Sequence, residues 1–182
     1  MIDTLSPAMI AAYLDRSGYR FYRAGAGEGF LVLFAPRDVT DIGTQVHIDT
    51  EDEVLSVRVI TDRLFQPDQR ARLETLCNEW HGEYRWPMVY VRTRSNGLLG
   101  VVAEGHLNTT GTGVHQALVD KFCSVVINCA HDFWDWLLHQ DLEGLSDDLD
   151  DLDDLDSGLD RLLDKPEPSR PEFRNPDDAE HT

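Results

Sequence analysis

Basic residues are scarce in this sequence. Its 182 residues include 16 Lys and Arg against 34 Asp and Glu, so the formal net charge is −18 with the histidines neutral. A phosphate backbone is bound chiefly by Lys and Arg, which release counterions, and this balance argues against DNA or RNA as a partner. The same argument disfavours docking on an anionic membrane surface.

Cysteines and long apolar runs are also few. Cys77, Cys123 and Cys129 are an odd number with no CxxC pair, which indicates reduced thiols rather than a disulfide framework. The first ten residues, MIDTLSPAMI, contain neither a basic region nor a long apolar stretch, so we expect neither a signal peptide nor a transmembrane helix. We therefore predict a cytoplasmic protein with no membrane partner.

The charge is concentrated at one end of the chain. Residues 141–182 contain 16 Asp and Glu and 4 Lys and Arg, a net charge of −12, whereas residues 1–140 have a net charge of −6. We therefore divide the chain into a domain, residues 1–140, and an acidic tail, residues 141–182. From Lys165 onward the tail is rich in Pro and charge and poor in aliphatic residues, which predicts disorder.

The first half of the tail is rich in leucine and aspartate. Leucines recur every three or four residues from 142 to 162, and Leu145, Leu149 and Leu152 are the candidate partner-binding residues. Like charges three or four apart repel, so we expect this segment to be largely disordered alone and helical only against a partner. A low-complexity solubilising tail is the other interpretation, and the more frequent one for acidic runs.

Motifs for bound phosphate or metal are incomplete. Gly25, Gly27 and Gly29 form a GxGxG run, but the residues after it resemble a strand rather than a helix start, so a hairpin turn is favoured. Cys77 and His81 stand four residues apart without a second ligand pair for zinc. The aspartates of the tail never follow the calcium-loop spacing. We predict no cofactor and no metal site.

One polar cluster is compatible with acid–base chemistry. His131, Asp135 and His139 recur every four residues, with Asp132 beside them, but no motif nearby supplies a nucleophile. A solvated stripe of a helix is the favoured interpretation. We predict no catalytic residues and no enzyme activity.

The remaining pattern predicts an α+β fold. The expected order is a helix from Pro7, three or four antiparallel strands, a helix from Pro67 to Trp80, a β-hairpin around Asn96-Gly97 and a long C-terminal helix over 114–140. The final helix has two apolar stripes, so we expect it to be covered on both sides, by its own sheet and first helix or by another chain.

Three tryptophans are candidate protein-binding residues. Trp80 and Trp86 bracket the start of the predicted hairpin, and Trp134 lies in the last helix. Core aromatics that fasten the second helix to the next strand are the simpler interpretation. A peptide-binding surface is the alternative, since interface anchors are often aromatic.

Residues from Asn78 to Trp134 carry a family resemblance. The stretches NEWH from Asn78, RWPMVYV from Arg85, and VAE from Val102, with Phe133 and Trp134, resemble actinobacterial proteins of the YbjN family, and the element order agrees over about residues 5–139. His81 departs from the family, whose members usually carry Asn there. The resemblance implies a type III secretion chaperone-like fold and a protein-binding or regulatory role; those chaperones are small acidic dimers that hold an extended partner segment.

These observations favour a noncatalytic, chaperone-like, protein-binding module, with a homodimer as one form of it. The alternative is a regulatory or signalling protein whose acidic leucine segment masks its own binding surface, in which case truncation after Gln140 would increase binding. A third hypothesis is an acidic decoy that mimics nucleic acid, and strong salt dependence of binding would mark it.

Overall fold

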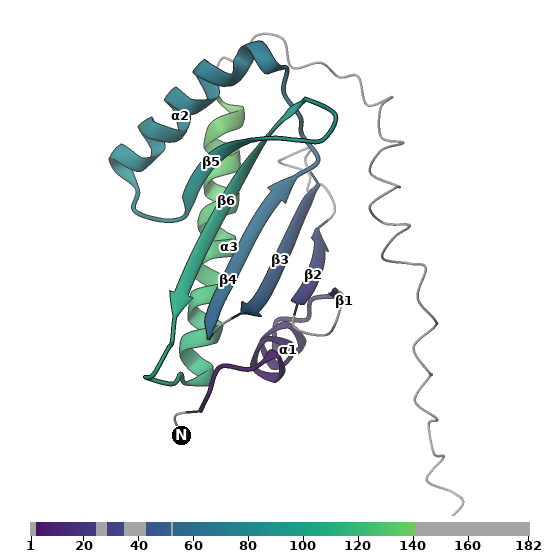
Figure 1. The fold of residues 1–182 in the computed structure, drawn as a ribbon, viewed down its shortest axis with the longest axis vertical. Helices are drawn as coiled ribbons and strands as arrows, with labels where there is room; N and C mark the ends of the chain where they lie inside the picture. The colour runs from purple at the N-terminus through teal and green to yellow at the C-terminus, as the bar shows by residue number, and fades with distance from the viewer. Residues whose placement is uncertain (1–2, 25–28, 35–42, 52, 141–182) are drawn as a thin grey trace, which may run out of the picture. The chain divides into compact units, whose positions relative to one another are not determined.

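The structure is a computed structural model that describes residues 3–24, 29–34, 43–51 and 53–140 (Figure 1). These residues belong to a compact unit, Met1–Asp147, and the predictions for the acidic tail lie outside the described residues. The helices and strands are α1 (Pro7–Arg16), β1 (Phe21–Ala24), β2 (Gly29–Phe34), β3 (Thr44–Glu51), β4 (Val54–Thr61), a short 3₁₀ turn η1 (Pro67–Gln69), α2 (Arg70–Glu83), β5 (Met88–Thr93), β6 (Leu99–Asn108) and α3 (Gln116–Leu138).

The strands form one antiparallel sheet in the order β1-β2-β3-β4-β6-β5. Each strand of the meander β1 to β4 pairs with the next, and the β5–β6 hairpin then adds to β4 through β6. This arrangement confirms the predicted α+β class and the predicted order of elements. It also gives six strands among the described residues, with β6 in an interior position of the sheet.

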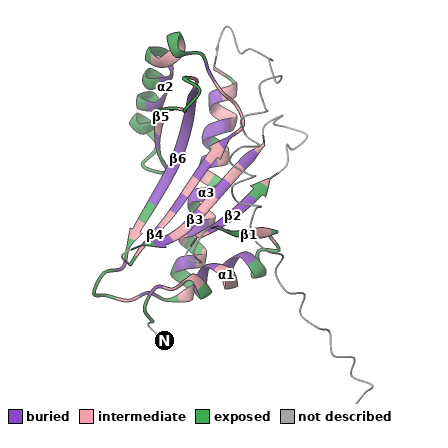
Figure 2. Ribbon diagram, turned by 45° about the vertical axis from the view of Figure 1, so that its right-hand side comes forward, coloured by how far each residue is buried: buried purple, intermediate pink, exposed green. Residues whose placement is uncertain are grey.

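The helices pack on one side of this sheet. Figure 1 shows α3 running along one face, with α1 near one end of it and α2 beside β5. Alternate residues of β3 and β4, among them Val46, Ile48, Val57 and Val59, are fully buried on the helix side (Figure 2). The intervening residues are intermediate in exposure, so the two faces of the sheet differ in the way that strand alternation predicts.

Helix α1 begins and ends as its sequence predicts. Pro7 occupies the first turn, where its missing N–H costs nothing, and the chain leaves the helix at Gly18 with φ +70°. The apolar face of α1 is buried, and Arg16 at its end makes two hydrogen bonds to the carboxylate of Asp120 on α3, at 2.7 and 2.8 Å. This contact between exposed groups fixes α1 against the first half of α3.

The predicted Asn-Gly turn closes the β5–β6 hairpin. Gly97 has φ +86°, a conformation that favours glycine, and the Asn96 side chain accepts a hydrogen bond from the N–H of Leu98 at 3.1 Å. Strand β6 is longer than β5, whose pairing with it reaches only from Leu99 to Glu104. The last four residues of β6, 105–108, therefore have a strand partner on the β4 side alone.

Gly105 allows α3 to lie close to β6. A Cβ atom added at this position would stand 2.5 Å from Cγ2 of Val126 and 3.1 Å from Cζ3 of Trp86. We expect Gly105→Ala to lower the free energy of unfolding by about 1–3 kcal/mol, because Val126 is fully buried and has little room to move. Urea unfolding followed by circular dichroism measures the change.

A matched glycine provides the control for this prediction. A Cβ at Gly82, in α2, would meet nothing within 4 Å, so Gly82→Ala should leave stability unchanged or raise it by up to about 1 kcal/mol. Combining Gly105→Ala with Val126→Ala should cost less than the sum of the two single changes. Additive losses would show that the Cβ added at position 105 does not clash with the Val126 side chain.

Candidate functional site

The sheet face opposite α3 carries a polar network. The register of β3, β4 and β6 places His47, Arg58 and Glu104 in one row across this face, with Asp49, Ser56 and His106 in the next row. We call the face that contains these residues the open face, because α1 and α3, of the described elements, pack on the other side. Its polar residues alternate with buried apolar residues along each strand.

Glu104 is the centre of this network. The Arg58 guanidinium donates from Nε at 2.9 Å and from Nη2 at 2.6 Å to Oε1 of Glu104, and the Tyr90 hydroxyl donates to Oε2 at 2.9 Å. Only 5% of Glu104 is exposed. Burial opposes its ionisation, but the hydrogen bonds from Tyr90 and Arg58 and the charge of Arg58 outweigh burial and hold the pKa of Glu104 below its usual value.

Two histidines border the network. Nε2 of His106 lies 3.6 Å from Glu104, and its Nδ1 lies 3.0 Å from the hydroxyl of Ser56. Burial and the charge of Arg58 lower the pKa of His47. The Glu104 carboxylate is thus already bonded to an arginine and a tyrosine, so it joins β4, β5 and β6 rather than acting as a free base.

A second surface, apolar in character, lies beside the part of β6 that extends past the start of β5 at Met88. Trp86 packs across Gly105 and meets Phe122 of α3 edge to face, with ring centres 5.9 Å apart. Leu118, Phe122 and Val125 share one face of α3 because they are three or four residues apart. Trp86 is 44% exposed, Leu118 45% and Val125 40%. We call these four residues the apolar surface.

The free part of β6 adjoins this surface. Leu99 exchanges two backbone hydrogen bonds with Phe65 on the β4 side, whereas Leu98 accepts one from Arg94 on the β5 side. Because backbone direction alternates along a strand, His106 and Asn108 turn their N–H and C=O groups outward. Within the described ranges, no strand pairs with these two residues on the outer side.

The three predicted tryptophans have different environments. Trp80 is 3% exposed and stacks on Tyr84, with the rings of Phe133 and Trp136 also against it. Trp134 is 2% exposed and contacts Phe133. Of the three, only Trp86 is accessible to a partner in this structure. Leu145, Leu149 and Leu152 lie outside the described residues.

Cys77 and His81, which were considered above as possible zinc ligands, have separate roles in the described structure. His81 Nε2 accepts a hydrogen bond from the backbone N–H of Val89 at 3.0 Å, which links α2 to the edge strand β5. Cys77 and Cys123 are buried free thiols, and burial raises the pKa of Cys77 to about 11 and that of Cys123 to about 12. No group of three or more His, Cys, Asp or Glu within the described part of the chain could hold a metal ion.

The histidines of the polar stripe on α3 also contact different neighbours. His131 lies 3.4 Å from the Thr44 hydroxyl and packs edge to face on Phe34, at 5.5 Å between ring centres. His139 donates from Nδ1 to the carbonyl of Asp135 at 2.6 Å, within its own helix turn. His131 thus packs α3 against the sheet and does not belong to a solvated stripe, whereas His139 is exposed and bonds within its own helix.

Sequence reasoning missed the Arg58–Glu104 network. Its signal was present, since each strand carries one charged residue among apolar neighbours, Arg58 in VLSVRVIT and Glu104 in LGVVAEGHLN. Only the β4–β6 register shows that the two stand opposite each other.

Among the described residues, no helix is long and apolar enough to cross a membrane.

The fold defines the class of protein: an α+β module in which helices cover one face of a single antiparallel sheet. A solved structure described as "Crystal structure of YbjN, a putative transcription regulator from E. coli" is similar to this chain, with a TM-score of 0.54 at 10% identity. The match covers 75% of this chain and 90% of that chain, and at this identity it shows a shared fold.

Residues 6–139 match the YbjN family, described as "Putative bacterial sensory transduction regulator", and the chain belongs to this family. The match confirms the family resemblance of the sequence from Asn78 to Trp134. No curated protein matched the chain in the sequence comparison.

Proposed function

We propose that this protein is a noncatalytic, chaperone-like module that binds an extended segment of a protein partner. The apolar surface carries this proposal: Trp86, Leu118 and Val125 each expose 40% or more of their area on one side of α3. Contiguous exposed apolar side chains mark interaction sites, and aromatic anchors such as Trp86 dominate binding energies there.

The free part of β6 favours an extended partner. A segment lying beside His106 and Asn108 would bond to their outward backbone groups and add a strand to the sheet. Its side chains on the helix side would then meet Trp86 and the exposed stripe of α3. The description of the family as a sensory transduction regulator supports a role that works through partner proteins, and the free cysteines support a reducing compartment such as the cytoplasm.

Charged substitutions on this surface test the proposal. Leu118→Asp with Val125→Asp in the full chain should reduce the amount of co-purified partner at least tenfold, because two carboxylates would be buried in an apolar contact. Mass spectrometry of proteins captured on the tagged chain measures this amount. The control, Ala71→Asp with Asn78→Asp, adds the same charges at exposed positions of α2, away from the surface.

Two outcomes would contradict the proposal. Equal capture by the Leu118/Val125 variant and by the control would show that partners bind elsewhere. Light scattering adds the second outcome: a mass near twice the 20.7 kDa of one chain that falls to one chain only in the Leu118/Val125 variant would assign the surface to a homodimer.

A further inference from the structure

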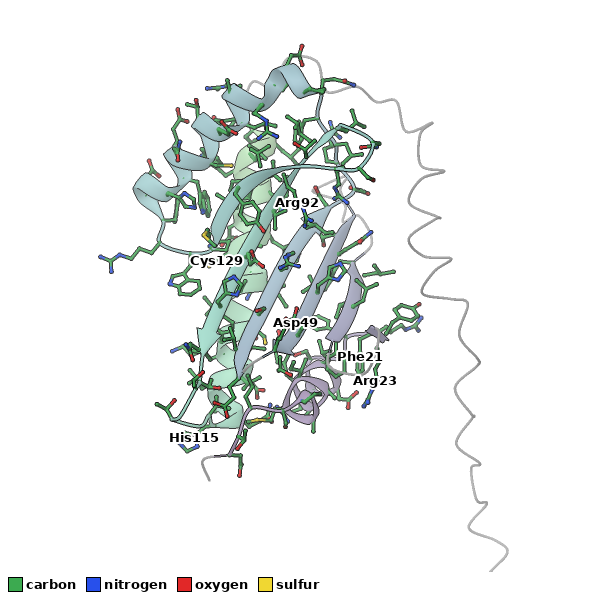
Figure 3. All side chains as sticks on the ribbon, in the orientation of Figure 1. Phe21, Arg23, Asp49, Arg92, His115 and Cys129 are labelled. Carbon is green, nitrogen blue, oxygen red and sulfur yellow. The ribbon has the colours of Figure 1, made fainter. Side chains whose placement is uncertain are left out.

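Two arginines at the hairpin end of the open face have no carboxylate partner among the described residues. Arg92 on β5 stands opposite Gly100 on β6, and Figure 3 shows Arg92 and Asp49 on the sheet face turned away from α3. Arg94 follows β5 and lies back over Gly100, where an added Cβ would be 3.0 Å from its Nε. Glycine at position 100 therefore allows the guanidinium of Arg94 to rest on the sheet.

The charges of this pair are not compensated by the described residues. With the described residues, the side chain of Arg94 makes one hydrogen bond, from Nη2 to the carbonyl oxygen of Thr61 at 3.4 Å, although a guanidinium has five N–H donors. No ion pair within the described ranges includes Arg92 or Arg94, whereas Arg58 on the same face is bonded to Glu104. Burial and the neighbouring Arg92 lower the pKa of Arg94.

Apolar side chains border the two arginines. Val102 pairs with Tyr90 on one side and with Ile60 on the other, so these three residues form a row across the open face next to Arg92. Val102 itself is buried, so a ligand held there would meet the guanidinium groups together with the half-buried side chains of Tyr90 and Ile60.

We propose that Arg92 and Arg94 bind carboxylates of an acidic, leucine-containing segment of a protein partner. A planar guanidinium matches a carboxylate in a two-point contact, and an anion from outside would provide the charge partner that the sheet lacks. Nucleic acid fits less well, because the row beside the arginines, Tyr90, Val102 and Ile60, carries no further cation to follow a phosphate backbone. The half-buried side chains of Tyr90 and Ile60 contact the leucines.

This site is separate from the apolar surface, because Arg92 and Arg94 lie on the opposite face of the sheet from α3. The arginine site could therefore be confirmed even if the apolar surface binds no partner. The apolar surface could likewise be confirmed even if the arginines bind no acidic segment. Residues 141–164 of this chain have the composition that the site requires, with leucines every three or four residues among aspartates. A synthetic peptide of that sequence is therefore a suitable probe.

The experiment is a titration of the fluorescein-labelled peptide with the full chain, followed by fluorescence anisotropy. Arg92→Gln with Arg94→Gln should weaken binding at least tenfold. Arg20→Gln with Arg72→Gln removes the same charge from exposed positions elsewhere and should change affinity less than twofold. Leu118→Asp with Val125→Asp should bind the peptide normally, which separates this site from the apolar surface.

Equal losses in the two arginine variants, or no loss in either, would overturn the proposal. A peptide with every leucine replaced by glutamine should bind at least tenfold more weakly. Unchanged affinity would show that the peptide binds through its charge alone and would overturn the role of the leucines. A single-stranded oligonucleotide that binds more tightly than the peptide, with the same arginine dependence, would assign the site to nucleic acid instead.

The acidic tail of the same chain is the remaining competitor for the site. The described elements all end by Leu138, so a chain ending at Gln140 retains the whole described fold. Similar peptide affinity for this chain and the full chain is expected if the site serves a partner. Binding only to the shortened chain would overturn the proposal in favour of a segment that masks its own domain.

Discussion

Replacing Phe133 by alanine is expected to lower the free energy of unfolding by about 3–5 kcal/mol, the usual range for a large aromatic residue removed from a core. Phe133 is fully buried and its ring lies 5.2 Å from that of Trp80 and 5.3 Å from that of Trp134. It thus joins α3 to α2 in the part of the core where these helices meet. Urea unfolding followed by far-ultraviolet circular dichroism measures the loss.

Phe122 is the matched control for this substitution. It lies on the same helix but is only partly buried, so Phe122→Ala removes the same atoms at a site that water already reaches. Its loss should be smaller than that of Phe133→Ala by at least about 1 kcal/mol, in proportion to the smaller buried area. Equal losses in the two variants would contradict the assignment of Phe133 to the core between the helices.

The second large effect is expected at Glu104. Glu104→Gln keeps the shape of the side chain but leaves the Arg58 guanidinium without its carboxylate partner. We expect a loss of roughly 1–3 kcal/mol, below the range for breaking a fully buried ion pair, because 37% of the Arg58 side chain is exposed to water. Urea unfolding at pH 7 measures this loss.

The dependence on pH identifies the charge as the cause. The pKa of Glu104 is lowered in the folded state, so its carboxylate contributes stability above its unfolded pKa of about 4.5, and that contribution is lost as pH falls through the folded value. The difference between wild type and Glu104→Gln should therefore be largest near neutral pH and should shrink at pH 3. A difference that is the same at both pH values would contradict this explanation.

A double-mutant cycle completes the test of the network. Arg58→Met alone should also destabilise the protein, but the combination with Glu104→Gln should cost less than the two single losses added together, because each single variant leaves one partner unmatched. Additive losses would show that Arg58 and Glu104 do not depend on each other.

Local signals in the sequence were sufficient for the helices and the hairpin. Pro7 and Gly18 mark the limits of α1, and Asn96-Gly97 can form the tight turn between β5 and β6, because these preferences belong to the residues themselves. The long amphipathic pattern likewise predicted α3, which ends within two residues of the expected limits, at Gln116 and Leu138.

Nonlocal features could not be predicted in the same way. Arg58 and Glu104 are 46 residues apart, and their contact depends on the register between β4 and β6. The sequence also did not distinguish Trp86 from Trp80 and Trp134, since the exposure of Trp86 depends on the start of β5 at Met88, opposite Glu104, and on the close approach at Gly105. Both features depend on strand length and pairing rather than on residue type.

The central claim, that the apolar surface binds a protein partner, is tested most directly by photo-crosslinking. A photoactivatable phenylalanine analogue placed at Leu118 of the full chain, in cells that produce the protein, should yield an adduct with a second protein. The same analogue at Asn78, an exposed position on α2 away from the surface, should not. Adducts of equal yield from both positions, or none from Leu118 while the protein remains folded, would contradict the account.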